Sequence, residues 1–166
     1  MENRITSSKI STNLWFDHIA EPAVDFYLSV FKNASKGRVA RYGNAGQEFH
    51  GMEPGTILTI EFKLEGQTFV ALNAGPEFKF NESISFIINC NDQEEVDYYW
   101  DKLSDGGEIQ MCGWLKDQFG VSWQVVPTVL TDLLQNSDPK KTSRVMAALM
   151  TMKKLDIAKL KQASEG

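Results

Sequence analysis

The side chains that could carry acid–base or nucleophilic chemistry are few and widely separated in this chain. The 166 residues include two histidines, His18 and His50, and two cysteines, Cys90 and Cys112. A histidine base needs an orienting carboxylate, and the two glutamates beside His50 are close only in sequence. Neither cysteine has a histidine nearby or belongs to a Cys-x-x-Cys pair, which favours two buried thiols over a nucleophile or a zinc cluster. No catalytic residue is assigned from these groups.

Composition and charge exclude several classes of function. Hydrophobic residues make up 42% of the chain and charged residues 23%, as in ordinary globular domains. The 22 acidic residues outnumber 17 basic ones, and the net charge of −5 repels phosphate backbones and anionic lipids. The first nine residues are polar and lack the apolar segment of a signal peptide. We therefore expect a cytoplasmic protein that binds neither nucleic acid nor membranes.

The elements that must position these groups form a repeated pattern. The first half predicts a strand, a helix and three further strands at residues 9–16, 21–32, 37–42, 56–64 and 67–73. Pro22 suits the first turn of that helix, residues 43–55 form a glycine-rich loop, and Glu65-Gly66 predicts a tight hairpin turn. The second half predicts strands at 83–90, 107–114 and 121–126 and a helix at 92–104.

Two matches in the same order support an internal repeat. Val24-Asp25-Phe26-Tyr27 recurs 72 positions later as Val96-Asp97-Tyr98-Tyr99, and the same spacing places 12–16 over 84–88. Residues 66–72 recur 54 positions later as 120–126. A repeated βαβββ unit predicts two pseudo-symmetric modules of an α+β fold. A helical extension at 130–163 begins near Asp138-Pro139 and is expected to pack on the modules or on a second subunit.

Several motifs resemble one known family. They are Leu14-Trp15-Phe16-Asp17, Ala23–Tyr27 and, above all, the segment 112–127 (CGWLKDQFGVSWQVVP). These motifs resemble the PhnB-like branch of the vicinal oxygen chelate superfamily, which includes glyoxalases, bleomycin-resistance proteins and dioxygenases. The resemblance spans residues 8–127, and the helical tail is also typical of the branch. It implies one domain over 1–166, with modules 8–75 and 82–127 that form a cupped mixed sheet.

The branch often carries the name demethylubiquinone methyltransferase, and the sequence does not support that activity. A methyltransferase fold would place a glycine-rich loop between a first strand and a helix, and no such loop occurs here. Metal enzymes of the superfamily take ligands from the first and last strand of each module. The repeat places those positions at Ser11, Asn13, Ser83, Ser85, Val70 and Gln124. None is His, Asp or Glu, so we expect no metal and no cofactor.

The resemblance also implies a ligand site on the inner face of the sheet. If Gln124 points inward, strand alternation places Trp123 beneath the helices. Glu61 and Glu65 are expected to be solvent-facing charges. The expected ligand-binding residues are Asn13, Trp15, Asn73, Ser85, Cys112, Trp114 and Gln124.

The favoured hypothesis is a metal-independent protein that binds an unknown small molecule and forms a homodimer. One alternative is a metal-dependent lyase, isomerase or transferase of the same superfamily, in which Glu61 or His50 moves into the site. Another is a resistance protein that sequesters a drug without chemical change. Whether the protein is an enzyme is left open by the sequence.

Overall fold

The computed structural model describes residues 9–166, and its contacts divide the chain into two compact units, Met1–Lys79 and Phe80–Gly166. The first eight residues, where most of the polar N-terminal segment and the start of the first predicted module fall, lie outside the described residues. The boundary between the units falls in the linker between the predicted modules. Each unit is described by itself below.

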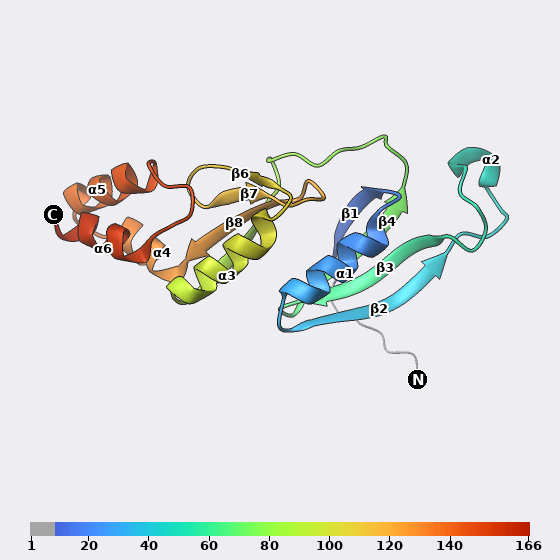
Figure 1. Ribbon diagram of the computed structural model, residues 1–166, viewed down its shortest axis with the longest axis horizontal. Coiled ribbons are helices and arrows are strands. Elements are labelled where there is room, and N and C mark those ends of the chain that lie inside the picture. Colours follow the sequence, from blue (N-terminus) through green and yellow to red (C-terminus); the bar gives the residue numbers. More distant parts are fainter. Residues whose placement is uncertain (1–8) are drawn as a thin grey trace. The chain divides into compact units, whose positions relative to one another are not determined.

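The first unit contains one βαβββ module (Figure 1). Its four strands lie in the order β1-β4-β3-β2, with β1 parallel to β4 and the other neighbours antiparallel. A short helix, α2, interrupts the predicted glycine-rich loop. The elements are β1 (Thr12–Asp17), α1 (Ala20–Val30), β2 (Ala34–Arg41), α2 (Gln47–His50), β3 (Ile57–Leu64) and β4 (Gln67–Ala74).

Alternating burial separates the two faces of this sheet. Because successive side chains of a strand point to opposite faces, Phe62 and Phe69 lie on the face that packs against α1. Tyr27 of α1 stacks on Phe62 with ring centroids 6.1 Å apart, and Phe62 stacks on Phe69 at 5.2 Å. Glu65 and Gly66 both have positive φ and join β3 to β4 as the predicted tight turn.

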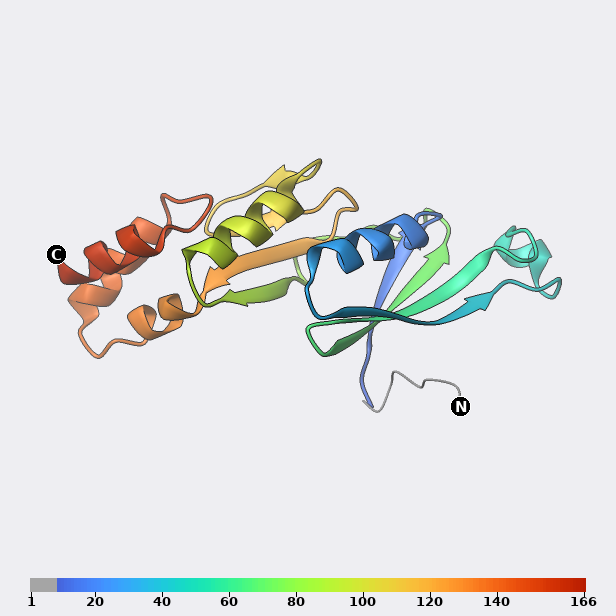
Figure 2. The same ribbon diagram turned by 60° about the horizontal axis from the view of Figure 1, so that its bottom comes forward.

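The second unit repeats the module in a shorter form. The order β5-β8-β7-β6 reproduces that of the first sheet, with β5 parallel to β8. Helix α3 lies along β8 in Figure 2, and its N-cap Asp92 accepts a hydrogen bond from the Glu95 backbone N–H. The elements are β5 (Phe86–Cys90), α3 (Gln93–Ser104), β6 (Glu108–Ile109), β7 (Trp114–Lys116) and β8 (Ser122–Pro127). This pair of βαβββ modules confirms the predicted α+β fold.

The predicted strand at 107–114 is wrong. The structure has β6 and β7 on either side of a turn at Met111, Cys112 and Gly113. Cys112 and Gly113 both have positive φ, a left-handed conformation that a strand does not tolerate. The backbone N–H groups of these two residues donate instead to the carbonyl oxygens of Met152 and Lys153. These two hydrogen bonds therefore tie the turn to the C-terminal segment, and the strand is interrupted there.

The C-terminal extension consists of three helices, α4 (Thr128–Leu134), α5 (Pro139–Leu149) and α6 (Ile157–Glu165). Asp138 caps α5, and Pro139 occupies its first turn as predicted. Val145, Leu149, Leu155 and Leu160 form a buried cluster with Leu130 of α4. Within residues 9–166, no helix combines the length and hydropathy needed to cross a lipid bilayer.

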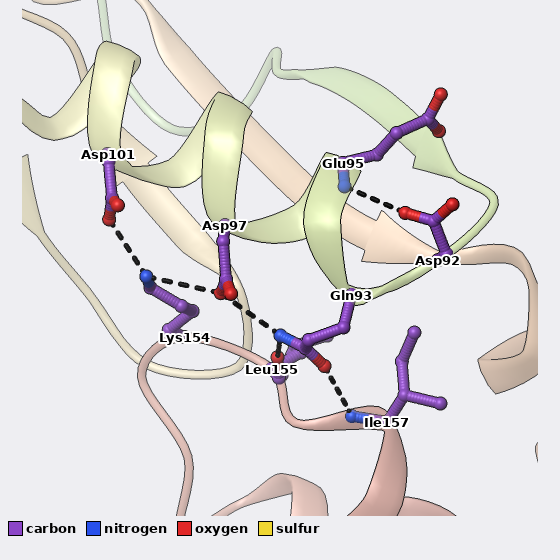
Figure 3. Close-up of polar contacts among 8 residues, drawn as sticks. All are labelled: Asp92, Gln93, Glu95, Asp97, Asp101, Lys154, Leu155 and Ile157. Carbon is purple, nitrogen blue, oxygen red and sulfur yellow. Dashed lines mark hydrogen bonds and ion pairs between the residues drawn. The ribbon is translucent and has the colours of Figure 1, made fainter.

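Gln93 and Lys154 attach the extension to α3 (Figure 3). The Gln93 amide donates to the Leu155 carbonyl oxygen at 3.1 Å and accepts from the Ile157 backbone N–H at 2.9 Å. Lys154 lies between Asp97 and Asp101, with Nζ–O distances of 3.3 and 2.8 Å. One helix of the module thus holds the chain that leads into α6.

Candidate functional site

The face of the first sheet that points away from α1 is called the first open face here. Strand register places Asn13 beside Val70 and Val70 beside Glu61, so these three residues form one row across β1, β4 and β3. Trp15, Leu72 and Thr59 form the next row. Two of the residues predicted to bind ligand, Asn13 and Trp15, therefore lie on the same face in adjacent rows.

Trp15 is held in place at the edge of the first open face. Its indole N–H donates to the Gly75 carbonyl oxygen at 2.8 Å. Phe78 contacts the indole edge-to-face, with ring centroids 4.8 Å apart. The half-buried ring therefore has a fixed orientation and presents a flat apolar surface.

Glu61 is not the solvated charge that the sequence predicts. Its side chain is only 17% exposed, and it forms a two-pronged ion pair with Arg38 of β2 at 2.6 and 3.1 Å. A register shift between Lys36 and Val39 interrupts the pairing of β2 with β3 at this point. Glu65, by contrast, is exposed, and it accepts hydrogen bonds from the backbone and side-chain N–H groups of Asn33.

The second open face is the corresponding side of the second sheet. Register places Ile87 beside Gln124 and Gln124 beside Trp114, in one row across β5, β8 and β7. The Gln124 amide donates to Ser85 Oγ at 2.9 Å. Three predicted ligand-binding residues, Ser85, Trp114 and Gln124, are therefore gathered on or beside this face.

Ser122 lies next along β8 on the same face as Gln124, and Trp123 lies on the opposite face. Trp123 is buried as predicted, and its indole N–H donates to Asp117 Oδ2 at 2.8 Å. The Ser122 hydroxyl is buried, and it has no hydrogen-bond partner among the described residues. A buried hydroxyl without a partner costs about 1–3 kcal/mol.

The register corrects the repeat-based alignment by two residues. Asn13 pairs with Val70 in the first module, and Ile87 pairs with Gln124 in the second. Ile87, and not Ser85, is therefore the counterpart of Asn13. Ser85 lies on the same side of the strand because a shift of two residues preserves the face.

Asn73 and Cys112 have other surroundings. Asn73 is buried on the α1 side, where Oδ1 accepts from the Ala20 backbone N–H and Nδ2 donates to the Ile57 carbonyl oxygen, each at 3.2 Å. The Cys112 thiol contacts Met150 Sδ at 3.7 Å, against the C-terminal extension. The structure therefore does not place these two with the other predicted ligand-binding residues.

The histidines lie outside both rows. His50 Nδ1 accepts from the Met52 backbone N–H at 3.0 Å, and its ring packs against Tyr42 at 4.5 Å. Burial raises the pKa of the Tyr42 hydroxyl. His18 is exposed and lies 3.5 Å from the Asp17 carboxylate. Across residues 9–166, no three His, Cys, Asp or Glu side chains gather closely enough to hold a metal ion.

The strand order, the parallel first and last strands and the repeated module define a protein of the vicinal oxygen chelate type. Residues 8–126 match the family described as 3-demethylubiquinone-9 3-methyltransferase. The chain therefore belongs to this family, in its PhnB-like branch, as the motifs predicted.

Solved structures agree with this assignment. A PhnB protein from Bacillus cereus is 32% identical, over 72% of this chain and 99% of that one, with a TM-score of 0.64. Protein PA1353 from Pseudomonas aeruginosa shares the fold at 20% identity, over 73% of this chain and 98% of that one, with a TM-score of 0.57. No curated protein matches the chain. The family match ends at 126, so the C-terminal extension lies beyond it.

Proposed function

We propose that this protein binds a small organic molecule on its open faces without a resident metal ion. The observation that carries the proposal is the residue set at the first-strand and last-strand positions, which is Asn13 with Val70 and Ile87 with Gln124. Amide and hydrocarbon side chains do not hold a transition metal tightly. They do suit hydrogen bonding and apolar contact with an organic ligand.

The side chains on the open faces indicate the kind of ligand. Trp15 and Trp114 offer indole surfaces for a planar ring. The half-buried Gln124 amide can donate and accept hydrogen bonds. These features favour a planar, moderately apolar molecule that carries a hydrogen-bonding group at its edge.

Metal content is the first test of this proposal. The purified protein is dialysed against Zn²⁺, Mn²⁺, Ni²⁺ or Fe²⁺, and metal content and melting temperature are then measured. Because an ion that binds only the folded state raises the apparent stability, the proposal predicts no stoichiometric metal and no shift. One ion per chain together with a clear shift would instead support the metal-dependent enzyme.

Dye binding tests the open faces directly. The probe is anilinonaphthalene sulfonate, a planar dye whose emission rises on transfer to an apolar surface. Trp114→Ala and Trp15→Ala should each lower the saturated emission, whereas Phe49→Ala, which removes an 88% exposed aromatic ring elsewhere, should not. Equal emission from all four proteins would contradict binding at the indoles.

We also propose that the chain forms a homodimer, as expected from the sequence. Sedimentation velocity of the full chain over a range of concentrations measures its mass directly. A species of twice the 18.7 kDa chain mass is the expected result, and a single species of chain mass at every concentration would overturn it.

A further inference from the structure

Sulfur atoms gather at the contact between the second module and the C-terminal extension. Cys112 Sγ lies 3.7 Å from Met150 Sδ. Met146 precedes Met150, the C-cap of α5, by one helical turn, since the Met150 backbone N–H donates to the Met146 carbonyl oxygen, and so both side chains emerge on one side of the helix. Met146 is 43% exposed and Met150 61% exposed, which is unusual for thioethers that could pack in a core.

The separation of the two sulfurs fits a shared metal ion. Two metal–sulfur bonds of about 2.3 Å that meet at a tetrahedral angle place their sulfur atoms about 3.8 Å apart. Thiolate and thioether ligands together select soft ions, of which Cu(I) is the biological example, over Zn²⁺ or Mn²⁺. The Cys112 thiol donates to Met150 Sδ at 3.7 Å, so loss of the thiol proton would leave the two sulfurs at a spacing that a soft ion can bridge.

We propose that Cys112, Met150 and Met146 form a binding site for a soft monovalent cation, Cu(I) or its redox-stable analogue Ag(I). The site belongs to the second unit alone and is independent of the open faces. Cys112 packs against the buried cluster of the extension, which supplies an apolar wall beside the thiol. Such a wall limits the access of water and oxidants to a bound Cu(I) ion.

Binding exchanges a proton for the metal. The Cys112 S–H bond breaks, the thiolate electron pair forms the bond to the cation, and the proton passes to solvent. The thioethers of Met150 and Met146 donate lone pairs and release no proton. Neither copper nor sulfur changes oxidation state in this step.

Cys90 provides an internal comparison because it is the other thiol of the chain. It is fully buried in β5, and burial together with the carboxylates of Glu95 and Asp92 raises its pKa to about 12. A thiol of this kind is inert towards metals, since the thiolate is the ligand. We therefore expect Cys90→Ala to bind Cu(I) as the unmodified protein does.

The experiment measures Cu(I) affinity by competition with a coloured chelator, bathocuproine disulfonate, under anaerobic conditions, and is repeated with Ag(I) by calorimetry. The unmodified chain should bind one ion. Met150→Leu and Met146→Leu should each weaken Cu(I) binding at least about tenfold. Loss of a residue that only orients a metal ligand already lowers metal affinity by about tenfold or more, and these methionines would bind the metal directly. Met52→Leu, at a buried methionine of the first unit, should leave the affinity unchanged.

Cys112→Ser should abolish stoichiometric binding, and circular dichroism checks that this variant is folded. Because Leu nearly matches Met in volume, the methionine variants keep the test valid even if Cys112→Ser unfolds. Unchanged Cu(I) affinity in both methionine variants would show that the thiol binds alone, and the proposed site would be wrong. Binding of less than one ion by the unmodified chain would overturn it equally.

Discussion

The two open faces share one backbone frame and differ in the chemistry of their side chains. In the first module the row across β1, β4 and β3 is Asn13, Val70 and Glu61, whereas the matching row of the second is Ile87, Gln124 and Trp114. The last residue of the first row, Glu61, forms an ion pair with Arg38, whereas the last residue of the second row is Trp114. The helix-covered faces, by contrast, keep large apolar residues at equivalent positions.

The comparison shows at which positions the fold of the module restricts the residue type and at which positions it does not. Phe69 and Trp123 are equivalent in register, and both are buried against a helix. Burial on that face stabilises the fold, so its residue types are restricted. The open faces contribute less to folding, and so the side chains there can differ between the two modules.

The hairpins before the last strands show the same divergence. The first module uses the two-residue turn at Glu65 and Gly66. In the second module the buried Asp117 carboxylate accepts hydrogen bonds from the backbone N–H groups of Phe119 and Val121 and from the Trp123 indole. One turn depends on backbone conformation, whereas the other depends on a buried charge.

The largest effect is therefore expected from Asp117→Ala. It leaves three donors of the second module without their acceptor, and each buried donor left unsatisfied costs about 1–3 kcal/mol. Glu65→Ala in the first module removes an exposed side chain and should cost less than about 0.5 kcal/mol. Urea denaturation followed by tryptophan fluorescence measures both, and similar losses would break the comparison of the two hairpins.

The ion pair of the first open face should give an intermediate effect. A double-mutant cycle with Arg38→Met and Glu61→Gln should yield a coupling free energy of about 1 kcal/mol. This value is the upper end of the range for exposed ion pairs, and Arg38 is 45% exposed. The coupling should fall as salt rises because exposed charges are screened. Trp114 holds the position in the second module that Glu61 holds in the first, and it carries no charge. The salt dependence of the stability of Trp114→Phe therefore serves as the reference. A coupling near zero in low salt would show that the pair contributes nothing.

The smallest effect is expected at the Glu82–Lys116 ion pair, at the edge of the second open face. The hydrogen bond from the Lys116 ammonium, 2.5 Å away, lowers the pKa of the Glu82 carboxyl below its ordinary value. A carboxyl group whose pKa is lower in the folded state stabilises the fold above its unfolded pKa and loses this contribution as the pH falls through the folded pKa. Glu82→Gln should therefore be slightly less stable than the unmodified chain at pH 7, and the difference should vanish in acid. A difference that persists or grows at pH 3 would contradict this assignment.

The sequence predicted the module architecture well because the repeat and the hairpin turn are local signals. It placed Trp123 beneath the helices, opposite the Gln124 that the resemblance put on the inner face, because strand alternation fixes the side of each residue. It misplaced the strand at 107–114, since nothing local marks Cys112 as left-handed. That conformation is set by hydrogen bonds to Met152 and Lys153, forty residues away.

The Arg38–Glu61 pair was missed for a similar reason. Alternation along β3 places Glu61 on the face opposite Phe62, which was a usable signal that it faces the proposed ligand surface. Its partner lies 23 residues earlier, beyond a register shift that no pattern in the chain predicts. Asn73 was assigned to the ligand site because it is polar, yet its amide joins β4 to the first residue of α1 and to β3.

The Gln93 side chain has a consequence for the order in which the second unit folds. Its amide holds backbone atoms at Leu155 and Ile157, which lie 62 and 64 residues further along the chain. Gln93 takes up its position only once the first turn of α3 exists, so this attachment of the extension cannot form before that helix does. During synthesis these residues emerge well after α3, and their docking closes loops of 62 and 64 residues. Protection of the Ile157 amide from hydrogen exchange should therefore be among the last to appear on refolding.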